Sequence, residues 1–230
     1  KRCSGTRRQA SSPPGEAVVG ARPLRLRTVQ SITAPEWPPR QTHAGVDFEE
    51  TMNDAPLSAT AWFGIGANLG DRLANVSHAL SLLAETCHDL SASAVFETPP
   101  WGDPDQPSFL NLVARGSTRL TPEALLARVK EIEHIVGRRP TRRWGPRIVD
   151  VDILAYGDLS ARTSALEIPH PRMAERAFVM VPLADLDPAW MHPVLGLTAT
   201  AMVAALPASD RRGVVRVGPA PQFRAVSATK

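Results

Sequence analysis

The ten residues 148–157, IVDVDILAYG, decide the expected fold. Apolar residues alternate here with two aspartates, and a period of two is typical of a β-strand with one buried face. Val149 and Val151 then face a core, whereas Asp150 and Asp152 lie next to each other on the opposite face. The stretch therefore predicts a strand that buries one face and displays two neighbouring carboxylates on the other.

The apolar pattern on both sides of this strand predicts further strands and two helices. The first helix begins after Asp71, and the second begins at Thr121 and ends at Gly137. The expected strands are residues 61–66, 93–98, 109–118 and 148–157, with a further strand at 178–186 and a final helix at 198–206. The order β-α-β-β-α-β, followed by a C-terminal appendix, predicts an α+β two-layer sandwich with an antiparallel sheet under two helices.

The first 58 residues differ in composition from the rest of the chain. The formal net charge is +3, but residues 1–40 carry eight Lys or Arg and two Glu, so the remainder is slightly acidic. Pro, Ser, Gly and Arg dominate this region without a regular apolar period, which favours disorder. We expect a disordered basic leader over 1–58 and one folded domain over 59–230, whose tail after about 208 is poorly ordered. An organellar transit peptide and a nucleic-acid-binding arm are the alternatives for the leader.

Several classes of protein are excluded by composition and motifs. No run of 18 apolar residues predicts a transmembrane helix, and two cysteines cannot form a disulfide framework, so we expect a cytoplasmic protein. The sequence contains no Walker A loop, no dinucleotide-binding fingerprint and no nucleophile elbow. The glycine-rich residues 64–68 are too generic to assign.

The aspartate pair gains meaning from the arginine-rich loop before it. Two adjacent carboxylates repel each other unless a cation lies between them, and carboxylate oxygens suit Mg²⁺. Five arginines within 138–147 could bind phosphate oxygens. Together the two features indicate a Mg-nucleotide site; the alternatives are solvated aspartates and a solvated basic loop.

Two further clusters offer groups for binding. His170, between two prolines and followed by Arg172 and Arg176, could donate to a phosphate or act as acid or base, unless it is an ordinary surface histidine. Asn111 could hydrogen-bond to the edge of a heterocycle. Flat aromatic faces that could sandwich a ring, or that belong to the core, are those of Trp101, Phe109 and Phe178.

Four segments, in this order, closely resemble the 6-hydroxymethyl-7,8-dihydropterin pyrophosphokinase family of folate biosynthesis. They are GIGANLGDR (64–72), ETPPWGDPDQPSFLN (97–111), GRRPTRRWGPRIVDVDILAYG (137–157) and IPHPRMAERAFVMVPL (168–183). The resemblance covers about residues 61–195. It implies a ferredoxin-like α+β fold and Mg-dependent transfer of pyrophosphate from ATP to 6-hydroxymethyl-7,8-dihydropterin, which yields AMP and the pterin diphosphate.

The same resemblance implies roles for individual residues. Asp150 and Asp152 would hold two Mg²⁺ ions and, with Arg138 and Arg147, would be the catalytic residues. Residues implied in ATP binding are Glu133, Arg138, Trp144, Arg147, Ile153, His170 and Arg176. Residues implied in pterin binding are Thr98, Pro100, Trp101, Phe109, Asn111 and Phe178.

The sequence also departs from the family pattern. The stretch from Gly137 to Trp144 is about one residue shorter than in some members and contains Pro140, so the roles of Arg139, Arg142 and Arg143 stay open. Ala165 stands where some members carry a polar contact to the nucleotide.

Two other functions compete with this interpretation. One is a nucleic-acid-binding module, which requires aromatic residues and a basic face on the sheet. The other is a family member that binds nucleotide without turnover, against which the intact aspartate pair and Arg147 argue. We expect a monofunctional, monomeric enzyme with small-molecule substrates and with neither nucleic acid nor membrane as a partner.

Overall fold

The computed structural model describes residues 58–100, 104–139 and 145–223. The elements in chain order are β1 (Ala59–Ala67), α1 (Arg72–Ala84), β2 (His88–Ala92), β3 (Val95–Thr98), β4 (Phe109–Thr118), α2 (Pro122–Val136), β5 (Asp150–Tyr156), β6 (Ala161–Arg162), β7 (Glu167–Ile168), a 3-10 turn (Met173–Glu175), α3 (Ala177–Leu186), α4 (Ala199–Ala205), α5 (Ala208–Arg212) and β8 (Val215–Gly218). The expected order β-α-β-β-α-β is present from β1 to β5; the strand expected at 93–98 is β3, and β2 before it is an additional short strand that the sequence analysis does not predict.

The strands of the main sheet pair in the order β5-β1-β4-β3-β8, and β2 also pairs with β4. Each of these pairings is antiparallel. Strand β1 therefore lies between β4 and β5 over residues 61–66. The expected antiparallel sheet and α+β class are confirmed.

Alternation along the strands divides the interior into two cores. Phe63 and Ile65 of β1, with Val151 of β5, are buried in the core that α1 and α2 cover. Local sequence explains both helices: Asp71 accepts a hydrogen bond from the Ala74 backbone at 3.0 Å, and Gly137 ends α2 with φ of 113°. This core is the two-layer sandwich that the sequence predicts.

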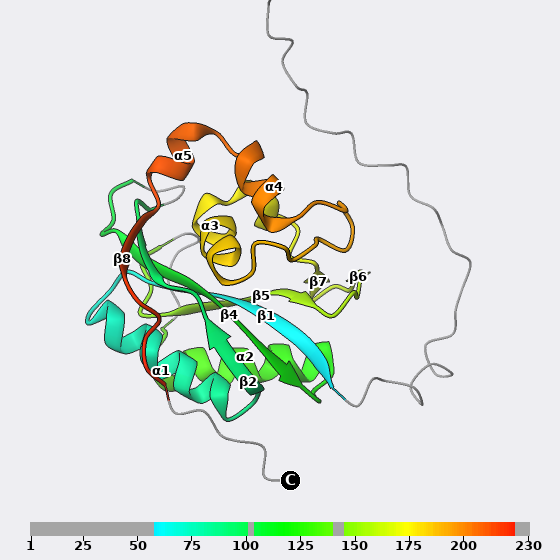
Figure 1. Cartoon of the computed structure of the whole chain (residues 1–230). Coiled ribbons are helices and arrows are strands. Elements are labelled where there is room, and N and C mark those ends of the chain that lie inside the picture. Colours follow the sequence, from blue (N-terminus) through cyan, green and yellow to red (C-terminus); the bar gives the residue numbers. More distant parts are fainter. Residues whose placement is uncertain (1–57, 101–103, 140–144, 224–230) are drawn as a thin grey trace, which may run out of the picture. The chain divides into compact units, whose positions relative to one another are not determined.

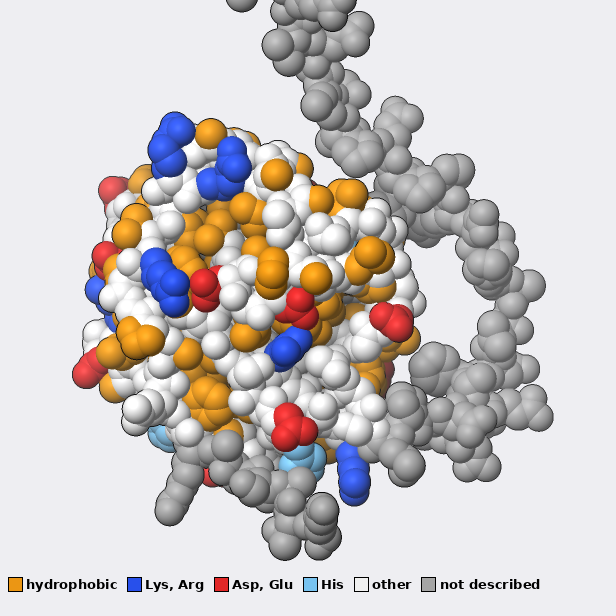
Figure 2. All heavy atoms as spheres, in the orientation of Figure 1, with side chains coloured by type: hydrophobic (Ala, Val, Ile, Leu, Met, Phe, Trp, Pro, Cys, Tyr) orange, Lys and Arg blue, Asp and Glu red, His pale blue; other side chains and the backbone are white. Residues whose placement is uncertain are grey.

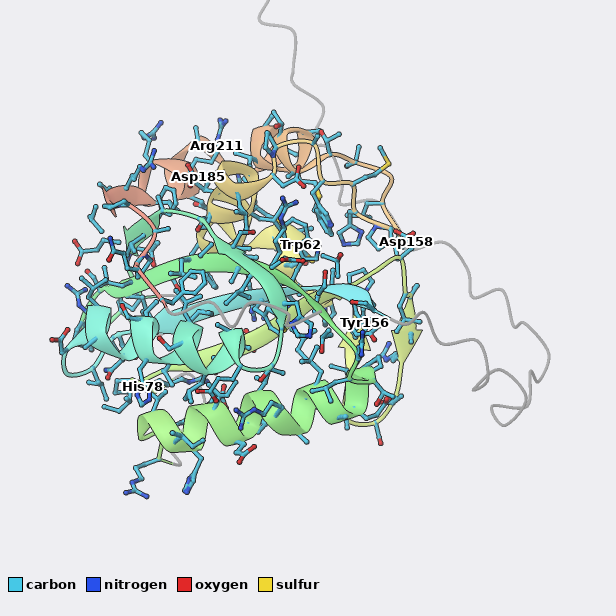
Figure 3. All side chains as sticks on the ribbon, turned by 60° about the horizontal axis from the view of Figure 1, so that its bottom comes forward. Trp62, His78, Tyr156, Asp158, Asp185 and Arg211 are labelled. Atoms are coloured by element: carbon cyan, nitrogen blue, oxygen red, sulfur yellow. The ribbon has the colours of Figure 1, made fainter. Side chains whose placement is uncertain are left out.

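The opposite face of the sheet carries a further layer, which the two-layer expectation lacks. Trp62 and Leu154 face away from α1 and α2 and are buried against α3 and α4 (Figures 1 and 3). The expected strand at 178–186 is wrong, because these residues form the helix α3. A nearly continuous apolar run of this length does not distinguish a buried strand from a buried helix, and here Val179, Met180 and Leu183 pack on the sheet as one helical face.

The C-terminal appendix is also more regular than expected. The predicted final helix is confirmed as α4, whose N-cap Thr198 accepts a hydrogen bond from Ala201. Beyond residue 208, where a poorly ordered tail is predicted, the structure describes α5 and β8, and β8 pairs with β3. Backbone pairing with a distant strand orders this segment, and such pairing leaves no local sequence period. Among the described residues, no helix has both the length and the apolarity to cross a membrane.

Candidate active site

Two glycines of β1 create the space for the candidate site. In the sheet register, Gly66 is paired with Asn111 of β4 on one side and with Asp150 of β5 on the other, and Gly64 is paired with Asp152. These residues share the face of Trp62, which Figure 3 shows on the α3 side of the sheet. Because neither glycine carries a side chain, the strand leaves a hollow between Asn111 and the two aspartates.

This hollow is part of a pocket of about 110 Å³. Its walls combine the C-terminal half of β1, the first residues of β4 and β5, the end of β3 and the beginning of α3. The pocket brings together eight of the residues that sequence analysis implies, namely Thr98, Phe109, Asn111, Arg147, Asp150, Asp152, Arg176 and Phe178. It therefore joins the residues implied for the pterin to those implied for metal and phosphate.

On the pterin side, the polar groups hold one another in place. The buried Asn111 donates a hydrogen bond from Nδ2 to Oγ1 of Thr98 at 2.7 Å, so its Oδ1 is on the side of Gly66. Phe109 of β4 and Phe178 of α3 line the same pocket. Pro99, rather than the predicted Pro100, lines the pocket wall.

Asp150 is held by two arginines. Arg138 donates to its Oδ1 at 2.6 Å, and Arg147 donates to its Oδ2. Burial acts to raise the pKa of Asp150, but the charges of Arg147 and then Arg138 outweigh it and hold the pKa below its usual range. Asp150 is thus ionised at neutral pH, and it fixes two arginines at the edge of the pocket.

Asp152 has the opposite electrostatic balance. Burial, and next the negative charge of Asp150, raise the pKa of Asp152, while His170 and Arg176 act against that shift. Nη1 of Arg176 lies 3.7 Å from Oδ2 of Asp152. A half-buried carboxylate whose charge is opposed by its neighbour favours a cation at this point of the pocket.

His170 lies beside Asp152 and Arg176. Its Nδ1 accepts a hydrogen bond from the Arg172 backbone at 3.3 Å, which places the proton of a neutral ring on Nε2. Burial lowers the pKa of His170, although Asp152 acts to raise it. Nε2 lies 3.5 Å from Nη1 of Arg176. Both groups then present donors to the same region, an arrangement that suits a phosphate oxygen.

Four residues implied for ATP do not line the pocket, namely Glu133, Arg138, Ile153 and His170, and two of them are buried in the interior. Glu133 is 2% exposed, and its Oε1 accepts a hydrogen bond from the Val151 backbone at 2.9 Å. Its carboxylate also pairs with Arg138 and with Lys130. Ile153 is buried in the core under α1 and α2. Glu133 therefore holds β5 and Arg138 in place, and the Ile153 side chain faces away from the site.

We expect replacement of Glu133 by Ala to lower the free energy of unfolding by about 2–4 kcal/mol, because it leaves the Val151 N–H and Arg138 without this acceptor. Urea denaturation measures the change. The matched control is Glu131→Ala, whose exposed carboxylate pairs with Arg128 at 2.8 Å and is expected to contribute about 1 kcal/mol or less. Equal losses in the two variants would contradict this role for Glu133.

A buried asparagine that sequence analysis did not assign fixes the loops around the pocket. Oδ1 of Asn68 accepts a hydrogen bond from the Arg147 backbone at 2.7 Å, and its Nδ2 donates to Gln106 at 3.2 Å and to the Pro107 carbonyl at 3.3 Å. Asn68 is 2% exposed. The end of β1 thus joins the arginine loop to the proline-rich loop. In the sequence, the alternation of Gly64 and Gly66 in an apolar strand is the signal that could have located this site, because it marks a strand face without side chains.

Some of the implied residues cannot be placed. Trp101 and Trp144 lie outside the described residues, as do Arg142 and Arg143. Among residues 58–100, 104–139 and 145–223, no three His, Cys, Asp or Glu side chains form a cluster that could hold a metal by themselves. A metal at this site would therefore depend on the aspartate pair together with ligands from the substrate.

Comparison with known proteins agrees with this geometry. The model of the 7,8-dihydro-6-hydroxymethylpterin-pyrophosphokinase (HPPK) family matches residues 62–188, which is more than half of the chain. The chain belongs to the HPPK family. The matched region includes every pocket residue named above. The activity of the family, pyrophosphokinase chemistry in folate biosynthesis, is therefore the activity of this chain.

Three relatives of this HPPK illustrate the match. The pyrophosphokinase of Aquifex aeolicus is 40% identical over 59% of this chain and 85% of its own length. That of Methylorubrum extorquens is 45% identical over 56% of this chain and 82% of its own. The mitochondrial folate synthesis bifunctional protein of Pisum sativum is 46% identical over 53% of this chain, but only 24% of the pea protein is covered.

Solved structures agree at the level of the fold. A crystal structure of a double mutant of Plasmodium falciparum HPPK-DHPS, with pterin and p-hydroxybenzoate, has a TM-score of 0.54 to this HPPK at 15% identity. The alignment covers 66% of this chain and 44% of that protein. At this identity the likeness concerns the fold alone.

Proposed function

We propose that this chain transfers the terminal pyrophosphate of ATP to the hydroxymethyl oxygen of 6-hydroxymethyl-7,8-dihydropterin, with Asp150 and Asp152 as ligands of two Mg²⁺ ions. The observation that carries the proposal is the row Asn111–Gly66–Asp150 across three adjacent strands. It places a group suited to a heterocycle edge and a group suited to a metal on either side of one glycine. A pterin bound by Asn111 would extend its hydroxymethyl arm over Gly66 toward the aspartates.

The pterin end of the pocket supplies flat surfaces and an amide. Phe109 and Phe178 would hold the ring between them, since aromatic side chains stack on planar heterocycles. Asn111 would hydrogen-bond to the ring edge, and its bond to Thr98 keeps the amide in one orientation. These groups position the substrate hydroxyl, which converts a bimolecular encounter into a reaction between neighbouring groups.

The phosphate end supplies positive charge. The hydroxymethyl oxygen forms a bond to the β-phosphorus, the bond from that phosphorus to the oxygen of AMP breaks, and the hydroxyl proton is released to solvent. Arg147 and Arg176 line the pocket and would stabilise the charge that develops on the transferred group. His170 would donate from Nε2 to a phosphate oxygen. Arg138 would contribute charge from its place beside Asp150.

The donor set fits Mg²⁺, which prefers carboxylate oxygens together with substrate phosphates. A divalent cation near Asp152 would relieve the repulsion by Asp150 that raises the pKa of Asp152. Each carboxylate oxygen has two acceptor sites, so Asp150 can bind a cation while it keeps its arginines. Bound Mg²⁺ neutralises phosphate charge and lowers the pKa of a coordinated hydroxyl.

The test is AMP release from Mg-ATP by the purified chain, with and without 6-hydroxymethyl-7,8-dihydropterin. We expect AMP and the pterin diphosphate only when the pterin and Mg²⁺ are both present. AMP release that does not depend on the pterin, or its absence under all conditions, would overturn the proposal.

Residues before β1 are not expected to contribute to catalysis. The strand begins at Ala59, and the pocket residues lie between Gly64 and Val179. We expect deletion of residues 1–58 to leave kcat and both KM values largely unchanged, measured by the same AMP assay. A large loss of activity would show that the leader takes part in the structure or its regulation.

The finer classification and setting are also proposals. The strand order β5-β1-β4-β3, with α1 and α2 on one face, supports a ferredoxin-like core. We propose a monomer that acts on small molecules in the cytoplasm, although the pea relative is named as a mitochondrial protein. Light scattering and fractionation of the native host would test these points.

The competing nucleic-acid interpretation receives no support from the layout. It requires a sheet face that is open and basic. In the described part of the chain, α1 and α2 pack on one face of the sheet, and α3 and α4 pack on the other (Figure 1). On the side shown in Figure 2, basic side chains are interspersed with acidic and apolar ones.

A further inference from the structure

The C-terminal segment α5–β8 contacts the wall of the pterin pocket from outside. A Cβ atom added to Gly213, the residue that ends α5, would lie 3.5 Å from Cγ and from Cδ of Pro99. Pro99 is also one of the residues that line the pocket. A side chain at position 213 would therefore contact a residue of the pocket wall directly.

Backbone pairing fixes this contact. In β8, Val215 pairs with Glu97 and Arg216 pairs with Phe96, so the two strands run together up to the residue before Thr98. Figure 1 shows β8 along the edge of the sheet, with α5 above it. Gly213 is therefore held next to Pro99 by strand pairing that begins two residues later.

Asp185 of α3 contacts both the beginning of β3 and β8. Oδ2 of Asp185 accepts a hydrogen bond from the Ala94 backbone at 2.9 Å, just before β3, and Oδ1 lies 3.8 Å from Nη1 of Arg216 in β8. In Figure 3, Asp185 of α3 and Arg211 of α5 lie on the same side of the sheet. Since α3 also carries Phe178, both walls of the pterin end are attached to one supporting unit.

We propose that α5–β8 positions the pterin-binding wall, and that Gly213 sets how far Pro99 and Thr98 extend into the pocket. The proposal rests on the proposed function, because it concerns the affinity for the pterin. Gly213 has φ of −73° and ψ of −9°, values that any residue adopts, so a larger side chain at this position would act through its size and not through backbone strain. A built Cβ at position 213 already lies in van der Waals contact with the Pro99 ring, so a side chain longer than Ala would press on Pro99 and displace it. Gly213 is thus a positioning residue that acts through Pro99.

The test is a graded series, Gly213→Ala, Gly213→Val and Gly213→Leu, with KM measured separately for the pterin and for ATP. A methyl group makes only ordinary contacts here, so we expect Ala to resemble the wild type. The larger side chains should raise the pterin KM, by about tenfold for Leu, because they displace a wall that contacts the substrate. The ATP KM and the Tm should stay unchanged.

The matched control is Gly218→Leu, since a Cβ atom added at that end of β8 would meet nothing within 4 Å. A folded Gly213→Leu variant with the wild-type pterin KM would overturn the proposal. So would equal rises in both KM values together with a lower Tm, because that pattern indicates a general loss of structure. If Gly213→Leu does not fold, the pterin KM, the ATP KM and the Tm of Gly213→Val are compared with those of the wild type in the same way. Absence of AMP formation by the wild type would instead refute the proposed function.

Discussion

Replacement of Asp152 by Ala is expected to lower kcat/KM for AMP formation by about 10³-fold or more, since it removes a proposed ligand of the Mg²⁺ that would neutralise the charge of the reacting phosphates. The same change should leave the Tm unchanged or raise it. The folded-state pKa of Asp152 is raised above its unfolded value, so ionisation of this carboxyl opposes folding. That opposition is absent below the unfolded pKa and grows as the pH rises through the folded pKa.

Opposite effects on activity and stability would identify Asp152 as a functional residue rather than a structural one. Steady-state kinetics and thermal unfolding, with and without Mg-ATP, measure both effects. We expect the variant to lose the rise in Tm that Mg-ATP produces in the wild type. The control is Asp158→Ala, an exposed acid in the turn after β5 (Figure 3). Near-wild-type turnover by the Asp152 variant would contradict the metal assignment.

Replacement of Gly66 by Ala is expected to raise the pterin KM by about 10²-fold, because the new methyl group displaces Asn111 from its place in the pocket. The added Cβ would lie 2.6 Å from Oδ1 of Asn111, closer than real Cβ atoms approach. Asn111 cannot yield easily, since it is buried and bonded to Thr98 at 2.7 Å. The ATP KM should change much less.

Two comparisons make this prediction specific. The added Cβ in Gly64→Ala meets only Leu154, at 3.4 Å, and a smaller effect is expected. If Gly66→Ala acts through Asn111, the double variant Gly66→Ala/Asn111→Ala should be no worse than Asn111→Ala alone. Additive effects in this cycle would show that Gly66 acts in another way.

Much of the fold could be predicted because its signals are local. Asp71, Thr121 and Gly137 mark helix ends through their own hydrogen bonds and backbone angles, and the structure confirms each of them. The alternation around Asp150 and Asp152 likewise predicts which face of β5 is buried, since strand geometry alone sets it. The helix α3 was mistaken for a strand because an apolar run buried on several sides has no clear period.

For the candidate site too, some features follow from the local sequence and others depend on contacts between distant residues. Residue type and spacing selected the aspartate pair, the arginines and Asn111, because the chemistry of those side chains does not depend on their neighbours. The opposition between the lowered pKa of Asp150 and the raised pKa of Asp152 depends on which arginines lie beside each carboxylate.

Other features became visible only when distant segments were brought together. The role of Gly66 depends on the register that places it between β4 and β5, and that of Gly213 on the pairing of β8 with β3. A glycine has no side chain whose chemistry could reveal its function. Its effect comes from the space that it leaves to residues far away in the chain, and only the folded arrangement determines that space.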